Sequence, residues 1–130
     1  HLALIKGVIT SKEKTMVRVH SFNPIVDLLE DLNVDGQNNL IYKAMKKIDN
    51  NNSGIVIIIN DSYKDFISKK LKADEEIETK DKNNLRQYGV GAQILSDLGV
   101  KNMTLLSNSK KKAIGLKGFN LSIVDWERLD

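Results

Sequence analysis

The chain has 130 residues, of which 41% are hydrophobic and 28% charged, values typical of one globular domain. Its formal net charge of +3 is too small to indicate a nucleic-acid-binding surface. No apolar run approaches the about 20 residues that a membrane span needs, so we expect a cytoplasmic protein without a membrane partner. The sequence has no cysteine and only two histidines. Disulfides, thiolate catalysis and cysteine-containing zinc sites are therefore excluded.

Two apolar segments at the start of the chain have strand character. Residues 2–9 and 15–20 are joined by a polar turn, and we predict that they pair as a hairpin. Alternation in the second segment buries Val17 and Val19 and directs Arg18 and His20 to the opposite face. These two polar side chains either contribute to a polar site on that face or face water on a one-sided sheet.

Two helices are predicted next. Asn23 and Pro24 are suited to begin a short helix over 25–32. Apolar residues at helical spacing predict a second, amphipathic helix over 37–48, which ends at the asparagine run 50–52.

The β-branched run Ile55–Ile59 is typical of a strand buried on both faces, and we expect it to be the central strand. Open α/β sheets bind ligands at the carboxyl ends of such strands, which makes the polar loop 60–64 a candidate ligand position. A further helix is predicted over 65–73. The charged stretch 74–84 is predicted to be exposed and mobile.

Residues 85–100 combine a glycine pair with a predicted helix. Gly89 and Gly91 precede the apolar stripe of this helix, and Gly99 is placed to end it as a left-handed cap. A G-x-G segment before a helix either lets the backbone approach a phosphate or forms a tight turn against the sheet. We favour the turn, because so short a glycine motif is common in turns.

The last part of the chain predicts a strand over 103–106, a helix led by three lysines over 110–116, a stop at Gly118 and a final strand over 121–126. We attribute the lysines to a solvated helix start rather than to an anion site. Together these elements predict one α/β domain over 1–130, with a mixed sheet and helices packed on it.

Several blocks of the sequence resemble GTP cyclohydrolase II, in family order and over nearly the whole chain. They include R-V-H-S after Val17 and R-Q-Y-G-V-G-A-Q-I-L from Arg86. The blocks lie at residues 1–7, 17–21, 86–95, 97–100, 105–108 and 118–121. The resemblance implies that family's fold and its reaction, which opens the imidazole ring of GTP, releases formate and pyrophosphate and begins riboflavin synthesis. It also implies a zinc ion held by three cysteines.

This chain departs from the family at the zinc site. The positions that match the three cysteines hold Asn23, Val34 and Gly36, with Asp35 between the last two. Valine has no donor atom, and a carboxamide does not replace a Lewis acid that lowers the pKa of bound water to about 7. We therefore expect no zinc and no other cofactor.

Further family positions have also changed. The glutamate of the R-V-H-S-E motif is Phe22, a phosphate-contacting glutamine is Asn39, and the R-Q-E-G-R-G segment is replaced over 60–65. The general-base aspartate matches Asn84, whose amide cannot accept the proton.

Some family positions are retained. Arg86 matches the arginine proposed as the family's nucleophile toward the GTP phosphate. The positions that match nucleotide contacts are Arg18, His20, Ser21, Ser107 and Lys112. They are either inherited residues without a catalytic role, which we favour, or the remains of a nucleotide site.

The sequence therefore predicts a degenerate GTP cyclohydrolase II-like domain without cyclohydrolase activity. Its expected role is structural or regulatory, in a bifunctional riboflavin-biosynthesis protein with an attached dihydroxybutanone-phosphate synthase domain. The alternative is a regulatory module that binds GTP, another purine nucleotide or phosphate. Because enzymes of the family are commonly dimeric, the resemblance also implies a homodimer.

Overall fold

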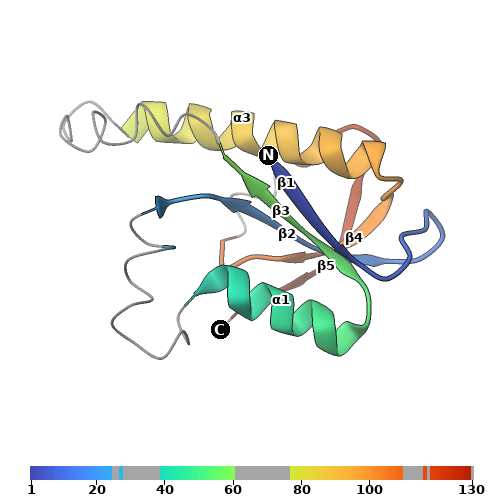
Figure 1. Cartoon of the computed structure of the whole chain (residues 1–130). Coiled ribbons are helices and arrows are strands. Elements are labelled where there is room, and N and C mark those ends of the chain that lie inside the picture. Colours follow the sequence, from blue (N-terminus) through green and yellow to red (C-terminus); the bar gives the residue numbers. More distant parts are fainter. Residues whose placement is uncertain (25–26, 28–38, 61–76, 110–115, 117, 130) are drawn as a thin grey trace.

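The computed structural model of the chain describes residues 1–24, 27, 39–60, 77–109, 116 and 118–129, with the backbone alone over 77–85. The elements are β1 (Leu2–Lys6), β2 (Thr15–Ser21), α1 (Leu40–Asn51), β3 (Gly54–Ile59), α3 (Ile77–Asp97), β4 (Asn102–Leu106) and β5 (Ser122–Glu127). The two helices cover opposite faces of the sheet (Figure 1). The α/β fold with helices on a mixed sheet is therefore confirmed. None of the described helices is long and apolar enough to cross a membrane.

The sheet has five strands in the order β1-β3-β2-β4-β5. Strand β1 runs antiparallel to β3, and the other neighbouring pairs are parallel. The predicted hairpin is wrong, because β3 lies between the two strands: Ile55 is paired with Ile5 on one side and with Val17 on the other. The chain between β1 and β2 lacks the tight two-residue turn that would impose direct pairing. Strand β3 is apolar on both faces, and an interior position with a strand at each edge buries it more completely than an edge position would.

Strand β3 is buried on both faces, as predicted. Ile55 and Ile57 belong to the core under α3, and Val56 belongs to the core under α1. The prediction that β3 is central needs correction, because β2 occupies the middle of the five strands. Val17 and Val19 of β2 are buried in the core under α3, as predicted.

Helix α1 begins at Leu40 because Asn39 caps it. The Asn39 side-chain oxygen accepts hydrogen bonds from the backbone N–H groups of Ile41 and Tyr42, at 2.8 and 3.2 Å. These bonds satisfy donors that have no partner within the first turn. The helix predicted over 37–48 is thus confirmed, but it spans Leu40–Asn51. Asn52 follows it as a cap in the left-handed conformation.

Helix α3 begins well before the predicted start and contains both glycines of the G-x-G pair. Neither the phosphate loop nor the tight turn is present there. A Cβ atom on Gly91 would lie 2.9 Å from Cγ1 of Val19, so the glycine allows the helix to approach β2 closely. The predicted cap at Gly99 is confirmed, with φ of 88° and a hydrogen bond from Val100 N to Leu95 O.

The stretch predicted as exposed and mobile over 74–84 is helical from Ile77 onward. Its glutamate and lysine residues favour helix even without an apolar stripe, and the apolar part of α3 continues the same helix. The strands predicted over 103–106 and 121–126 correspond to β4 and β5. The loop predicted over 60–64 and the helices predicted over 25–32, 65–73 and 110–116 lie largely outside the described residues.

Candidate functional site

The arrangement of the parallel strands marks one end of the sheet as the place for a ligand. Strand β2 leads through α1 to β3 at one side, whereas β4 lies at its other side and leads to β5. Helix α3, which leads into β4, covers the opposite face from α1 (Figure 1). Two adjacent strands whose connections leave in opposite directions form a topological switch point, and open α/β sheets bind ligands at the carboxyl ends of such strands. Residues at the ends of β2 and β4 are therefore the candidates.

His20 lies near this end of β2, Arg18 lies in the middle of the strand, and their side chains are joined in a buried polar chain. Only 8% of Arg18 and 6% of His20 are exposed. Nη1 of Arg18 donates to the backbone oxygen of Leu106, at 3.1 Å, and Nη2 lies 3.3 Å from Nδ1 of His20. The other ring nitrogen of His20, Nε2, lies 2.9 Å from Oδ2 of Asp27. The interpretation in which these side chains face water is therefore wrong.

Asp27 completes the chain, and the sequence analysis did not identify it. Its Oδ2 also accepts the backbone N–H of Asn23, at 2.7 Å, and its own N–H donates to Asn23 O. The hydrogen bonds with Asn23 therefore hold the carboxylate within reach of His20. The available signal was the acidic residue in the first turn after Asn-Pro, a position where a carboxylate often binds free backbone N–H groups.

The electrostatics of the chain follow from its burial. Removal from water lowers the pKa of Arg18, and the negative charges of Tyr88 when ionised and of Asp27 oppose that shift. Burial likewise raises the pKa of Tyr88, while the charge of Arg18 lowers it. Nε of Arg18 is buried and makes no hydrogen bond to any described residue.

The serines predicted as nucleotide contacts lie at the same end of the sheet. Ser21 is the exposed last residue of β2. Ser107 directly follows β4 and is buried, and its hydroxyl both donates to Ser109 O and accepts from Ser109 N, at 3.0 and 3.1 Å. In this arrangement the Ser107 hydroxyl stabilises the turn after β4.

The remaining predicted residues are not brought to this cluster. Arg86 is exposed on α3, which packs on the face of β2 opposite Arg18. Lys112 lies outside the described residues. Of the positions that match the family's cysteines, only Asn23 is described, and the described part of the chain contains no group of three His, Asp or Glu residues that could hold a metal ion. A carboxamide, a valine and a glycine do not fit the family's zinc ion.

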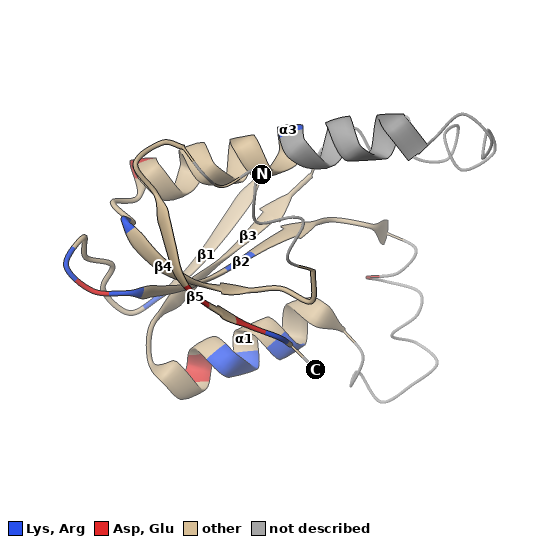
Figure 2. Ribbon diagram, turned by 180° about the vertical axis from the view of Figure 1, so that it is seen from behind, with Lys and Arg blue, Asp and Glu red and all other residues tan. Residues whose placement is uncertain are grey.

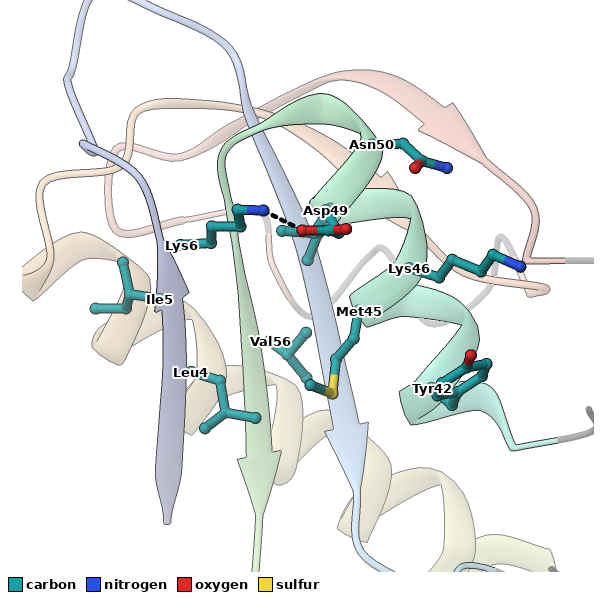
Figure 3. Close-up of a pocket in the computed structure, with 10 residues that line it drawn as sticks. Leu4, Ile5, Lys6, Tyr42, Met45, Lys46, Asp49, Asn50 and Val56 are labelled. Carbon is teal, nitrogen blue, oxygen red and sulfur yellow. Dashed lines mark hydrogen bonds and ion pairs between the residues drawn. The ribbon is translucent and has the colours of Figure 1, made fainter. Parts of the chain in front are cut away.

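A separate groove lies between β1 and α1, with a volume of about 520 Å³. Leu4, Met45 and Val56 line its apolar part, and an ion pair between Lys6 and Asp49 crosses one end (Figure 3). None of the predicted site residues lines this groove. On the ribbon, the charged residues of α1 are mainly basic, with Asp49 near its end, and basic and acidic residues alternate in the turn before β2 (Figure 2).

A family model for GTP cyclohydrolase II matches residues 1–128. The chain is 36% identical over 137 aligned residues to the riboflavin biosynthesis protein RibBA of Chlorobium phaeovibrioides, covering 96% of this chain and 33% of the relative. The RibBA proteins of Parabacteroides distasonis and Bacillus cytotoxicus are each 34% identical, with coverage of 96% of this chain and 34% of the relative. The chain therefore spans about a third of the length of these relatives.

Proposed function

The chain belongs to the GTP cyclohydrolase II family, and we propose that it is a degenerate member that serves riboflavin biosynthesis without cyclohydrolase activity. The observation that carries the proposal is the replacement of all three zinc cysteines by Asn23, Val34 and Gly36. Loss of one ligand leaves a weakened metal site, whereas loss of all three leaves no thiolate to hold zinc. The amide of Asn84 at the general-base position removes a second part of the reaction.

Local contacts of two altered positions support this proposal. The backbone N–H of Asn23 donates to Oδ2 of Asp27, the backbone oxygen of Asn23 accepts from the N–H of Asp27, and Asn39 caps α1 with its side chain. The resemblance implies that the residue matching Asn39 contacts the substrate phosphate in the family, whereas here the Asn39 side chain caps a helix. Such contacts favour a domain whose fold is maintained while its catalytic groups are absent.

We further propose that the domain acts as a structural or regulatory part of a longer protein with a dihydroxybutanone-phosphate synthase domain. The named relatives are riboflavin biosynthesis proteins about three times as long as the matched region. A domain that has lost its own reaction can still stabilise an attached enzyme or pair two copies of it. The homodimer implied by the family belongs to this proposal.

The test is a combined metal and activity assay. The purified domain is incubated with zinc and GTP, and bound zinc and released formate are measured beside an active GTP cyclohydrolase II. We expect neither stoichiometric zinc nor formate. A variant with Asn23→Cys, Val34→Cys and Gly36→Cys should gain zinc, which checks the assignment of the three positions. Stoichiometric zinc together with formate release from the unaltered domain would overturn the proposal.

One observation favours the alternative, a module that binds a purine nucleotide or phosphate. The unpartnered Nε of buried Arg18 lies on the strand that ends at the switch point. A buried guanidinium with a free donor is suited to an anionic oxygen. Calorimetry with GTP, pyrophosphate and inorganic phosphate should then show binding that Arg18→Lys abolishes.

The variant Arg86→Ala separates the two retained arginines. Binding that survives Arg86→Ala and disappears in Arg18→Lys locates the anion at the switch point, and the reverse locates it at α3. If no ligand binds at millimolar concentration, the module interpretation is wrong and the scaffold remains.

A further inference from the structure

We infer that His20 is a positioning residue for Arg18, held as the neutral tautomer that carries its proton on Nε2. The inference concerns the unliganded domain and holds whether or not the domain binds a nucleotide. It rests on three side chains in the buried polar chain: Arg18, His20 and Asp27. Each of the three is less than a tenth exposed.

The donor and acceptor chemistry of the chain selects this tautomer. A guanidinium has only donors, so Nδ1 of His20 must accept at the 3.3 Å contact with Arg18. A carboxylate has only acceptors, so Nε2 must donate at the 2.9 Å contact with Asp27. The Nε2–H tautomer satisfies both contacts, and each uses a different ring nitrogen.

The two other protonation states each break a contact. With the proton on Nδ1 alone, two donors face each other at Arg18, and the Nε2 lone pair faces the Asp27 carboxylate. A doubly protonated ring keeps the contact with Asp27 but sets an imidazolium N–H against the guanidinium. Two adjacent cations away from water are costly, because neither is fully compensated.

One carboxylate oxygen of Asp27 accepts two hydrogen bonds. Its Oδ2 receives the backbone N–H of Asn23 at 2.7 Å in addition to the ring N–H of His20. Two donors that converge on one oxygen hold the Asp27 carboxylate in place beside the ring of His20. In this buried polar chain, the neutral ring of His20 lies between the Arg18 guanidinium and the Asp27 carboxylate. Asp27 therefore compensates the charge of Arg18 across His20.

The functional consequence is a division of roles between two residues predicted as nucleotide contacts. Both ring nitrogens of His20 are engaged within the chain, so the ring sets the direction of the guanidinium. Leu106 O and His20 hold the two Nη atoms of Arg18, and Nε is left as the donor without a described partner. Arg18 is therefore the residue whose orientation the polar chain fixes, while His20 acts through it.

Nuclear magnetic resonance tests the tautomer directly on the unaltered 130-residue domain. Multiple-bond correlation of labelled histidine shows which ring nitrogen carries the proton. The chain has only His1 and His20, so a His1→Gln variant completes the assignment. We expect a protonated Nε2 and an unprotonated Nδ1 for His20 at neutral pH. A proton on Nδ1, a doubly protonated ring or a rapidly exchanging mixture would overturn the inference.

A rescue experiment tests the positioning role separately. In the unaltered domain, the two Nη groups of Arg18 should give separate, slowly exchanging resonances, because each has its own acceptor. His20→Gln should retain them, since the amide oxygen can accept from Arg18 while the amide nitrogen donates to Asp27. His20→Phe should lose them. If the Nη resonances are already averaged in the unaltered domain, His20 does not position Arg18, and this result stands even if His20→Phe fails to fold.

Discussion

Both faces of β2 are buried, but different kinds of interaction stabilise them. Val17 and Val19 pack under α3, with 0% and 4% exposed, among apolar side chains that need no particular orientation. On the other face, Arg18 and His20 are nearly as buried, but their polar atoms need specific hydrogen-bond partners. The apolar face therefore stabilises the fold through buried area, and the polar face fixes the direction of side chains at the switch point.

The largest expected effect comes from a cavity on the apolar face. Leu95 of α3 is fully buried in the core that contains Val17 and Val19. Leu95→Ala should lower the free energy of unfolding by about 2–5 kcal/mol, since the space left behind collapses only in part. Urea denaturation measures this change. Gln93→Ala on the exposed side of the same helix is the control, and an equal loss there would contradict the assignment of faces.

Substitutions on the polar face should lower the free energy of unfolding by smaller amounts, and these losses should not be additive. His20→Leu and Asp27→Leu each leave a buried partner unsatisfied, which costs about 1–3 kcal/mol. The double variant removes both groups, so its loss should be smaller than the sum of the two. A double-mutant cycle by urea denaturation measures the coupling. Strict additivity would mean that the 2.9 Å contact does not stabilise the domain.

The two glycines of α3 form a matched pair for the interface between helix and sheet. A Cβ at Gly89 meets nothing within 4 Å, so Gly89→Ala should raise the free energy of unfolding by about 1 kcal/mol through helix propensity. Gly91→Ala should forfeit that gain, because its Cβ would lie 2.9 Å from Val19. Thermal and urea unfolding of both variants measure the difference. Equal stabilisation would show that α3 does not pack so closely on β2.

The smallest effect appears at alkaline pH. Burial raises the pKa of Tyr88 above its ordinary value of 10.0 in the folded state. The contribution of the neutral phenol is fully present below the unfolded pKa and is lost as pH rises through the folded pKa. The free energy of unfolding should therefore fall above about pH 10, and Tyr88→Phe should reduce that slope. The exposed Tyr42→Phe is the control, and an equal reduction there would argue against burial as the cause.

Sequence patterns predicted where helices and strands form better than they predicted which elements lie next to one another. The β-branched run of β3 and the helical spacing in α1 are local, and both elements formed as expected. Strand order depends on pairing between distant segments, and the hairpin prediction failed because β3 entered between β1 and β2. The glycine pair was misassigned for a similar reason: Gly91 is accommodated in a helix by its contact with Val19, which the local sequence does not indicate.

The candidate site divides in the same way. The sequence alone determined the family blocks, the absence of cysteine and the positions of Arg18, His20, Ser21 and Ser107, because these depend only on residue identity and order. The tertiary structure decided which of them meet. Arg18 is bound by Leu106, 88 positions away, and the turn at Asn23 brings Asp27 to His20. These contacts are important because they are buried: a charge removed from water needs partners, and only the folded chain supplies them.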